Sequence, residues 1–158
     1  MKVAIYGQFY HQNSEKYVQQ LLDALEERNI EVHIEENFLQ IIRENEVIKK
    51  DYQKFKIFTQ LDNSYDLFFS IGGDGTILKS INYVKDLKIP IVGINTGRLG
   101  FLATIQKEEI EQTIASILQK NYNISQRELL SIATSPKNES LSDVNFALNE
   151  IAISRKNT

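Results

Sequence analysis

The chain has 158 residues, of which 42% are hydrophobic and 25% charged, so it is long enough to bury one full hydrophobic core. Its 18 basic and 21 acidic side chains give a formal charge of −3, without the basic block that would make nucleic acid an expected partner. The absence of cysteine excludes disulfide bonds and thiolate zinc sites, and no apolar run is long enough for a membrane span, so we expect a cytoplasmic protein without a membrane partner.

The first sixty residues predict a strand, a helix and a second strand, followed by a less regular segment. Residues 2–7 are typical of a short apolar strand, and Ser14 caps a helix with one apolar face. Residues 30–35 alternate between apolar and polar side chains, which predicts a half-buried strand with His33 on its polar face. Further on, residues 38–42 favour a short helix, and the polar residues 49–56 favour a surface connection.

The next sixty residues give clearer signals. The nearly continuous apolar run at residues 66–71 predicts a strand covered on both faces, and a glycine-rich segment and an amphipathic helix follow it. Residues 89–95 predict another buried strand, residues 96–101 a glycine-rich loop, and residues 110–118 a further amphipathic helix. Strands that alternate with helices predict an α/β fold for residues 1–121, with a doubly wound, mostly parallel, Rossmann-like sheet.

The pattern changes after residue 121. Residues 129–134 and 147–154 both favour strands, with no helix between them, so we expect residues 122–158 to begin a β-rich second domain. Two or three strands cannot close a sheet or cover their own apolar face. We therefore expect this second domain to be truncated at Thr158.

The segment Gly72-Gly73-Asp74-Gly75-Thr76 lies between a predicted buried strand and a predicted helix. Ligands of open α/β sheets bind at this end of a strand, where glycines allow close approach and the free N–H groups of a helix start favour phosphate. Asp74 suits a base that takes a hydroxyl proton or an anchor for magnesium. A tight turn is the alternative, but five such residues after a buried strand favour a functional site.

The same segment resembles the loop shared by NAD kinases, diacylglycerol and sphingosine kinases, and phosphofructokinases. The loop Asn95-Thr96-Gly97-Arg98-Leu99-Gly100-Phe101 resembles NAD kinases in particular, because the other families do not carry it in this form. The stretch Leu148-Asn149-Glu150-Ile151, followed by Arg155-Lys156, resembles the Asn-Glu motif of the same family. On these three motifs the chain is identified as the amino-terminal part of a member of the NAD kinase family.

The resemblance implies roles for individual residues. Asp74 would accept the proton of the 2′-hydroxyl, Asn149 and Glu150 would hold NAD, and Phe101 would offer an apolar surface near the base. The remaining residues of the implied nucleotide site are Gly72, Gly73, Gly75, Thr76 and Lys79. From the residues alone, Asn149 and Glu150 would be a solvated strand pair, Lys79 a helix-surface lysine and Phe101 a core aromatic. No set of protein ligands for a metal is predicted.

The reaction that the resemblance implies is the transfer of a phosphoryl group from ATP, or from polyphosphate, to the 2′-hydroxyl of the adenosine ribose of NAD. Magnesium or another divalent cation would neutralise the phosphates. The family also implies a homo-oligomer, a dimer or tetramer, and we expect the part present here to lack activity by itself. Two alternatives stay open: a lipid or sugar kinase of the same superfamily, and a nucleotide-sensing module without catalysis.

Overall fold

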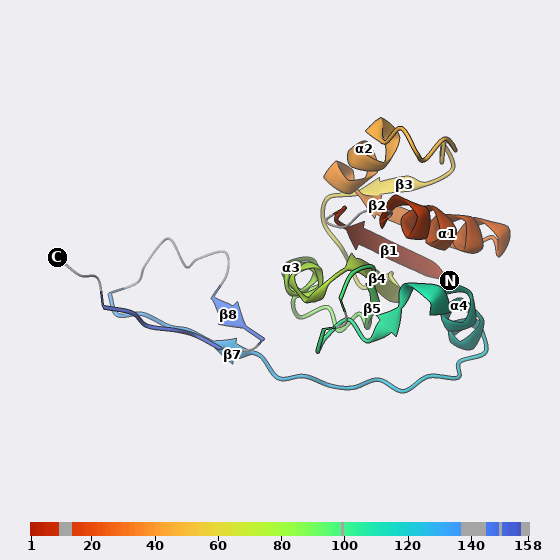
Figure 1. Cartoon of the computed structure of the whole chain (residues 1–158). Coiled ribbons are helices and arrows are strands. Elements are labelled where there is room, and N and C mark those ends of the chain that lie inside the picture. Colours follow the sequence, from red (N-terminus) through yellow and green to blue (C-terminus); the bar gives the residue numbers. More distant parts are fainter. Residues whose placement is uncertain (10–13, 99, 137–144, 149, 156–158) are drawn as a thin grey trace. The chain divides into compact units, whose positions relative to one another are not determined.

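The first 122 residues of the chain are built on one parallel sheet (Figure 1). The computed structural model describes residues 1–9, 14–98, 100–136, 145–148 and 150–155. The chain divides into two compact units, Met1–Tyr122 and Asn123–Thr158. The glycine-rich motifs around Asp74 and Asn95 belong to the first unit, and Glu150 belongs to the second.

The sheet of the first unit has six strands in the order β3-β2-β1-β4-β5-β6, and every neighbouring pair is parallel. The strand order reverses between β1 and β4, which is the arrangement of a doubly wound sheet. In such sheets ligands bind outside the carboxyl ends of the strands at the reversal. The strands are β1 (Lys2–Gly7), β2 (Glu31–Glu35), β3 (Lys56–Phe58), β4 (Leu67–Gly72), β5 (Ile91–Asn95) and β6 (Ile105–Gln106).

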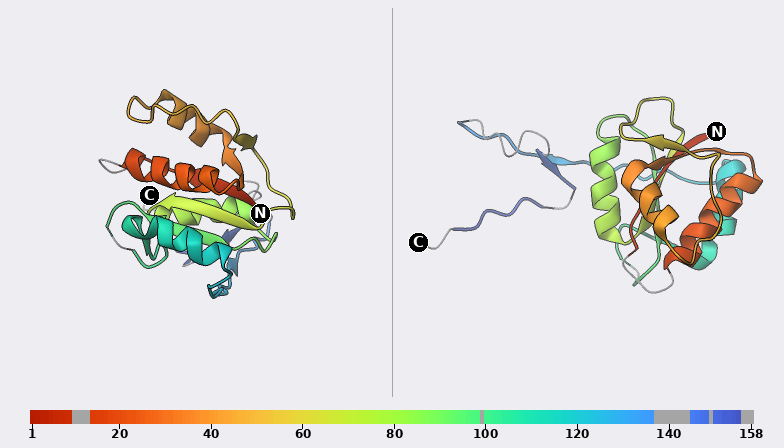
Figure 2. Two further views of the ribbon diagram at one scale, coloured as in Figure 1. Left: turned by 90° about the vertical axis from the view of Figure 1, so that its right-hand side faces the viewer. Right: turned by 90° about the horizontal axis from the view of Figure 1, so that it is seen from above.

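Four helices flank this sheet, with α3 on one side and α1 and α4 on the other (Figure 2). The helices are α1 (Ser14–Glu27), α2 (Glu36–Glu44), α3 (Asp74–Val84) and α4 (Ile110–Leu118), and a short 3₁₀ turn at Lys107–Glu109 leads into α4. Helices α1 and α4 pack against each other, and an ion pair of 2.9 Å between Arg28 and Glu111 lies beside this contact. The predicted α/β fold with a mostly parallel sheet is confirmed.

Strands β1 and β4 form the centre of the core. Every residue of β4 is buried, as the apolar run at residues 66–71 predicts, and Val3, Ala4 and Ile5 of β1 are fully buried beside it. Each large apolar side chain buried in this way stabilises the fold by roughly 1.5–3 kcal/mol. Strand β4, which ends at the candidate site, and its neighbour β1 are therefore among the most firmly packed parts of the first unit.

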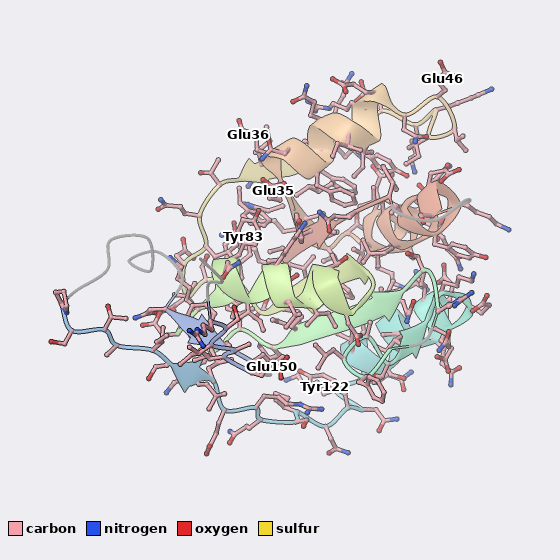
Figure 3. All side chains as sticks on the ribbon, turned by 60° about the vertical axis from the view of Figure 1, so that its left-hand side comes forward. Glu35, Glu36, Glu46, Tyr83, Tyr122 and Glu150 are labelled. Atoms are coloured by element: carbon pink, nitrogen blue, oxygen red, sulfur yellow. The ribbon has the colours of Figure 1, made fainter. Side chains whose placement is uncertain are left out.

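The prediction that residues 30–35 form a half-buried strand is wrong, because β2 is an internal strand between β1 and β3. His33 is 9% exposed, and its Nδ1 lies 2.9 Å from the hydroxyl of Tyr65. Glu35 is 4% exposed and accepts a hydrogen bond of 2.9 Å from the N–H of Phe38, which caps helix α2. Figure 3 shows Glu35 at the start of α2, with Tyr83 of α3 nearby.

The segment at residues 49–56 is also more than a surface connection. Tyr52 is 2% exposed, stacks on Phe55 with ring centroids 5.0 Å apart, and donates a hydrogen bond of 3.0 Å from its hydroxyl to Asp23 of α1. Lys56 then opens the edge strand β3. The aromatic residues recur every three positions among polar ones, so the segment has an apolar side that packs against the core.

The second unit contains one short antiparallel ribbon among its described residues. Strand β7 (Leu130–Ser131) pairs with β8 (Phe146–Ala147), and the N–H of Ile132 donates to the carbonyl of Asn145 at 2.7 Å. The strands are much shorter than the predicted 129–134 and 147–154, since a two-stranded ribbon whose side chains are exposed or only half-buried gains little from burial. None of the helices in the described part of the chain is long and apolar enough to cross a membrane.

The burial of Tyr52 gives a first prediction. Changing Tyr52 to Ala removes a ring from the core and should lower the free energy of unfolding by about 3–5 kcal/mol. Changing the exposed neighbour Lys54 to Ala should change it by no more than about 0.5 kcal/mol. Urea unfolding followed by circular dichroism measures both values, and equal small effects would show that the segment does not pack as described.

Candidate functional site

The turn from β4 to α3 depends on two residues of the Gly72–Thr76 loop. Gly72 has a φ of +155°, a conformation that side chains disfavour, and a Cβ at this position would overlap the hydroxyl of Thr76. Thr76 is 1% exposed, and its Oγ1 accepts a hydrogen bond of 3.3 Å from the N–H of Gly73. The buried side chain of Thr76 therefore stabilises the turn from β4 to α3.

The outer side of the same loop is open. A Cβ added to Gly73 or Gly75 would meet nothing within 4 Å, so packing in the described structure does not require a glycine at either position. The N–H groups of Asp74 and Gly75 belong to the first turn of α3, where backbone N–H groups have no partner within the helix. Two open glycines beside the positive end of a helix form a surface on which a phosphate can approach the backbone closely.

The Asp74 carboxylate is held by the loop that follows β5. Its Oδ2 accepts a hydrogen bond of 2.8 Å from the N–H of Phe101, and its Oδ1 accepts hydrogen bonds of 3.0 Å from the N–H groups of Leu102 and Ala103. A Cβ at Gly100 would overlap this carboxylate. The glycine before Phe101 is therefore required by the close approach of Asp74.

These contacts decide the charge state of Asp74. Partial burial by itself would raise the pKa of the carboxyl group, but the three backbone hydrogen bonds together lower the pKa of Asp74 below its ordinary value. Among the described residues, no charged side chain contributes to the shift in this pKa. Asp74 is therefore an ionised, oriented carboxylate at neutral pH.

A second anchor of the loop is Asn95, the last residue of β5. Its buried side-chain amide accepts a hydrogen bond of 2.8 Å from the N–H of Gly97 and donates one of 2.8 Å to the carbonyl of Arg98. Asn95 belongs to the family motif in the sequence, but the sequence predicts no role for its side chain. Its position at the end of a buried strand, directly before a glycine-rich loop, is the signal that could have found it.

The structure brings only some of the expected site residues together. Lys79 lies on the exposed side of α3, one turn after Gly75. Phe101 is 92% exposed, so the alternative of a core aromatic is wrong. Glu150 is exposed in the second unit, whereas Asn149 and Lys156 lie outside the described residues. The nucleotide contacts implied for all these residues stay predictions. Among the residues described, no group of three or more His, Asp or Glu side chains could hold a metal ion.

The family model described as "ATP-NAD kinase N-terminal domain" matches residues 3–122 of this chain. These residues include the Gly72–Thr76 loop and the loop that holds Asp74. The chain belongs to the NAD kinase family. The matched range includes the six-stranded sheet except for Lys2, so the family membership concerns the unit that contains Asp74 and the loop that holds it.

Curated relatives agree with this membership over the whole chain. It is 61% identical to an NAD kinase of Christiangramia forsetii and 44% identical to one of Flavobacterium johnsoniae, in both cases over 158 residues and all of this chain. An NAD kinase of Bacteroides fragilis is 35% identical over the same length. The chain spans 54% of the first two relatives, about half their length.

A solved structure of the same fold comes from yeast. The crystal structure of yeast NADH kinase complexed with NADH has a TM-score of 0.68 to this chain, covers 83% of it and shares 17% sequence identity. The match covers 39% of the yeast chain. At this identity the likeness concerns the fold alone.

Changing Gly100 to Ala tests the contact between the two loops. The new methyl group would displace the Asp74 carboxylate or the loop, so the free energy of unfolding should fall by about 1–3 kcal/mol. Gly75→Ala is the matched control, because its methyl group meets nothing and alanine favours the helix; stability should stay equal or rise by up to about 1 kcal/mol. If both variants lose stability equally, the described contact at Gly100 is wrong.

The lowered pKa of Asp74 predicts a pH dependence of stability. Because the folded-state pKa lies below the unfolded value of about 3.9, the ionised carboxylate stabilises the fold above that pH. This contribution is lost as the pH falls through the folded-state pKa. The stability difference between the wild type and Asp74→Asn, measured by urea unfolding, should be constant from pH 7 to about 5 and shrink at lower pH. A stability difference that grows as the pH falls would mean that folding raises the pKa of Asp74, and this would contradict the described hydrogen bonds.

Proposed function

We propose that this protein, at the length of its curated relatives, is an NAD kinase. It transfers a phosphoryl group from ATP, or from polyphosphate, to the 2′-hydroxyl of the adenosine ribose of NAD, and the product is NADP. The observation that carries the proposal is the oriented Asp74 carboxylate between the open glycines Gly73 and Gly75, at the amino terminus of α3. The family membership and the names of the curated relatives support the same reaction.

The hydrogen bonds of Asp74 suggest how it would meet its substrate. A carboxylate has about four lone-pair directions, and three of them are occupied by the N–H groups of residues 101–103. One direction is left for the hydroxyl of a ribose. In the proposed reaction Asp74 accepts that hydroxyl as a hydrogen-bond donor, orients its oxygen towards the phosphoryl group and takes its proton as the new bond forms.

A carboxylate with a lowered pKa is a weak base, and this fits phosphoryl transfer. The transition state of such transfers is loose, so orientation and charge stabilisation contribute more to the rate than proton removal does. The open N–H groups of Asp74 and Gly75 at the start of α3 would bind phosphate oxygens. Lys79, exposed one turn later, would add a positive charge on the same helix.

The residues present fit a divalent cation that arrives with the nucleotide. Asp74 is the single acid of the Gly72–Thr76 loop, and its remaining lone-pair direction is taken by the ribose hydroxyl in the proposed reaction, so the cation would be held mainly by the substrate phosphates. When bound, the cation would neutralise charge on those phosphates. We further propose that Phe101, whose ring is exposed, packs against a base of the bound dinucleotide and that Asn149 and Glu150 hold its ribose. The assembled protein would be a homo-oligomer, a dimer or tetramer.

Replacing Asp74 by Asn tests the proposal. The amide keeps one acceptor oxygen in place of two and cannot take a proton, so turnover should fall by about 10²-fold or more while the dissociation constant for NAD changes little. NADP formation from NAD, ATP and magnesium is measured on the chain continued to the length of its relatives. Asp86→Asn, an exposed acid beyond the end of α3, is the control and should keep full turnover.

Retained turnover in Asp74→Asn would overturn the role of Asp74. If the parent protein binds NAD and ATP but forms no NADP, a nucleotide-sensing module becomes the better account. If it forms no NADP but phosphorylates a lipid or a sugar, it is another kinase of the same superfamily.

A further inference from the structure

One buried side chain contacts the beginning and the end of loop 96–103, which follows β5. Asn95 is fully buried at the end of β5, and its Oδ1 accepts a hydrogen bond of 2.8 Å from the N–H of Gly97. Its Nδ2 donates to the carbonyl of Arg98 at 2.8 Å and makes a longer contact of 3.5 Å with the carbonyl of Ala103. The amide of Asn95 thus reaches the first residues of loop 96–103 and also its last one.

The same loop carries the groups that hold Asp74. Ala103 takes part in both sets of contacts, because its carbonyl faces Asn95 and its N–H donates to Oδ1 of Asp74 at 3.0 Å. The N–H groups of Phe101 and Leu102 complete the contacts to the carboxylate. Asn95 and Asp74 are therefore linked through backbone groups of one short segment.

The chemistry of the amide explains why asparagine suits this position. Only a side chain that both donates and accepts can satisfy the N–H of Gly97 and the carbonyl of Arg98 together, and an apolar residue would leave both groups unpaired. Thr96 provides a contrast next in the chain. It is 3% exposed, but its hydroxyl has no hydrogen-bond partner in the described part of the chain.

We propose that Asn95 is a positioning residue for the phosphoryl transfer: its side-chain amide closes loop 96–103 so that the N–H groups of residues 101–103 hold the Asp74 carboxylate towards the acceptor hydroxyl. The effect of Asn95 on catalysis rests on the proposed function. The hydrogen-bonded link from Asn95 to Asp74 does not, and it can be measured without any turnover.

The first experiment is amide hydrogen exchange in the Asn95→Leu variant, which has a side chain of similar size without donor or acceptor. Exchange at Phe101, Leu102 and Ala103 should rise about tenfold or more, because hydrogen bonds to a charged group contribute more than ordinary ones. Exchange in strands β1 and β4 should stay as in the wild type. Thr96→Val is the matched control and should leave the exchange of all these residues unchanged.

The second experiment follows Asp74 itself. The groups that face its carboxylate are the three backbone N–H groups, and no ionisable side chain in the described chain shifts its pKa. In Asn95→Leu the carboxyl carbon signal of Asp74 should titrate at a higher pH than in the wild type, because the N–H groups that stabilise its charged form are displaced. The acid limb of the pH–rate profile should move in the same direction, and kcat should fall about tenfold or more while KM for NAD stays within about threefold.

The outcomes separate the two proposals. Unchanged exchange at residues 101–103, or an unchanged titration of Asp74, would overturn the positioning role, and so would normal kcat in a variant whose loop exchanges rapidly. A failure of the proposed function would give a different result: the parent protein would form no NADP, although the amides of residues 101–103 are protected from exchange. If Asn95→Leu does not fold, Asn95→Ser keeps one hydroxyl and should give smaller changes of the same kind; no change in this folded variant would equally overturn the role.

Discussion

The site depends on one interaction between two loops, in which three consecutive backbone N–H groups after β5 hold the carboxylate that begins α3. Strands β4 and β5 pair in parallel, so their carboxyl ends lie side by side and the two loops meet. Gly72 makes the turn into α3, and Gly100 leaves room for the carboxylate of Asp74. Without either glycine the contact could not form in its present geometry, and the buried strands keep it in place.

The same interaction sets what Asp74 can do. Three hydrogen bonds keep it ionised and fix its direction, which lowers its strength as a base and improves its value as an orienting group. This balance suits phosphoryl transfer, where the loose transition state asks for little proton removal. The open glycines Gly73 and Gly75 leave the backbone of the Gly72–Thr76 loop accessible. The site therefore combines a carboxylate fixed by hydrogen bonds with an accessible backbone.

Much of the fold could be predicted from the sequence, because buried strands such as residues 66–71 and helices with one apolar face leave strong patterns. The Gly72–Thr76 loop could be predicted as a candidate site because its place after a buried strand is visible in the sequence. The hydrogen bonds from residues 101–103 to Asp74 could not, because backbone N–H groups carry no sequence signal. The burial of His33 and the packing of Tyr52 were missed because both depend on neighbours supplied by β3, α1 and the residues around Tyr65.

The contact between the two loops can be tested most directly by following the amide signals of Phe101, Leu102 and Ala103 by NMR during an acid titration. If their N–H groups hold the Asp74 carboxylate, all three amide proton signals should shift together, at one pH below the ordinary range of an aspartate, as the carboxylate takes up its proton. Signals that do not titrate, or that titrate independently of one another, would contradict the arrangement on which the proposed function of Asp74 is built.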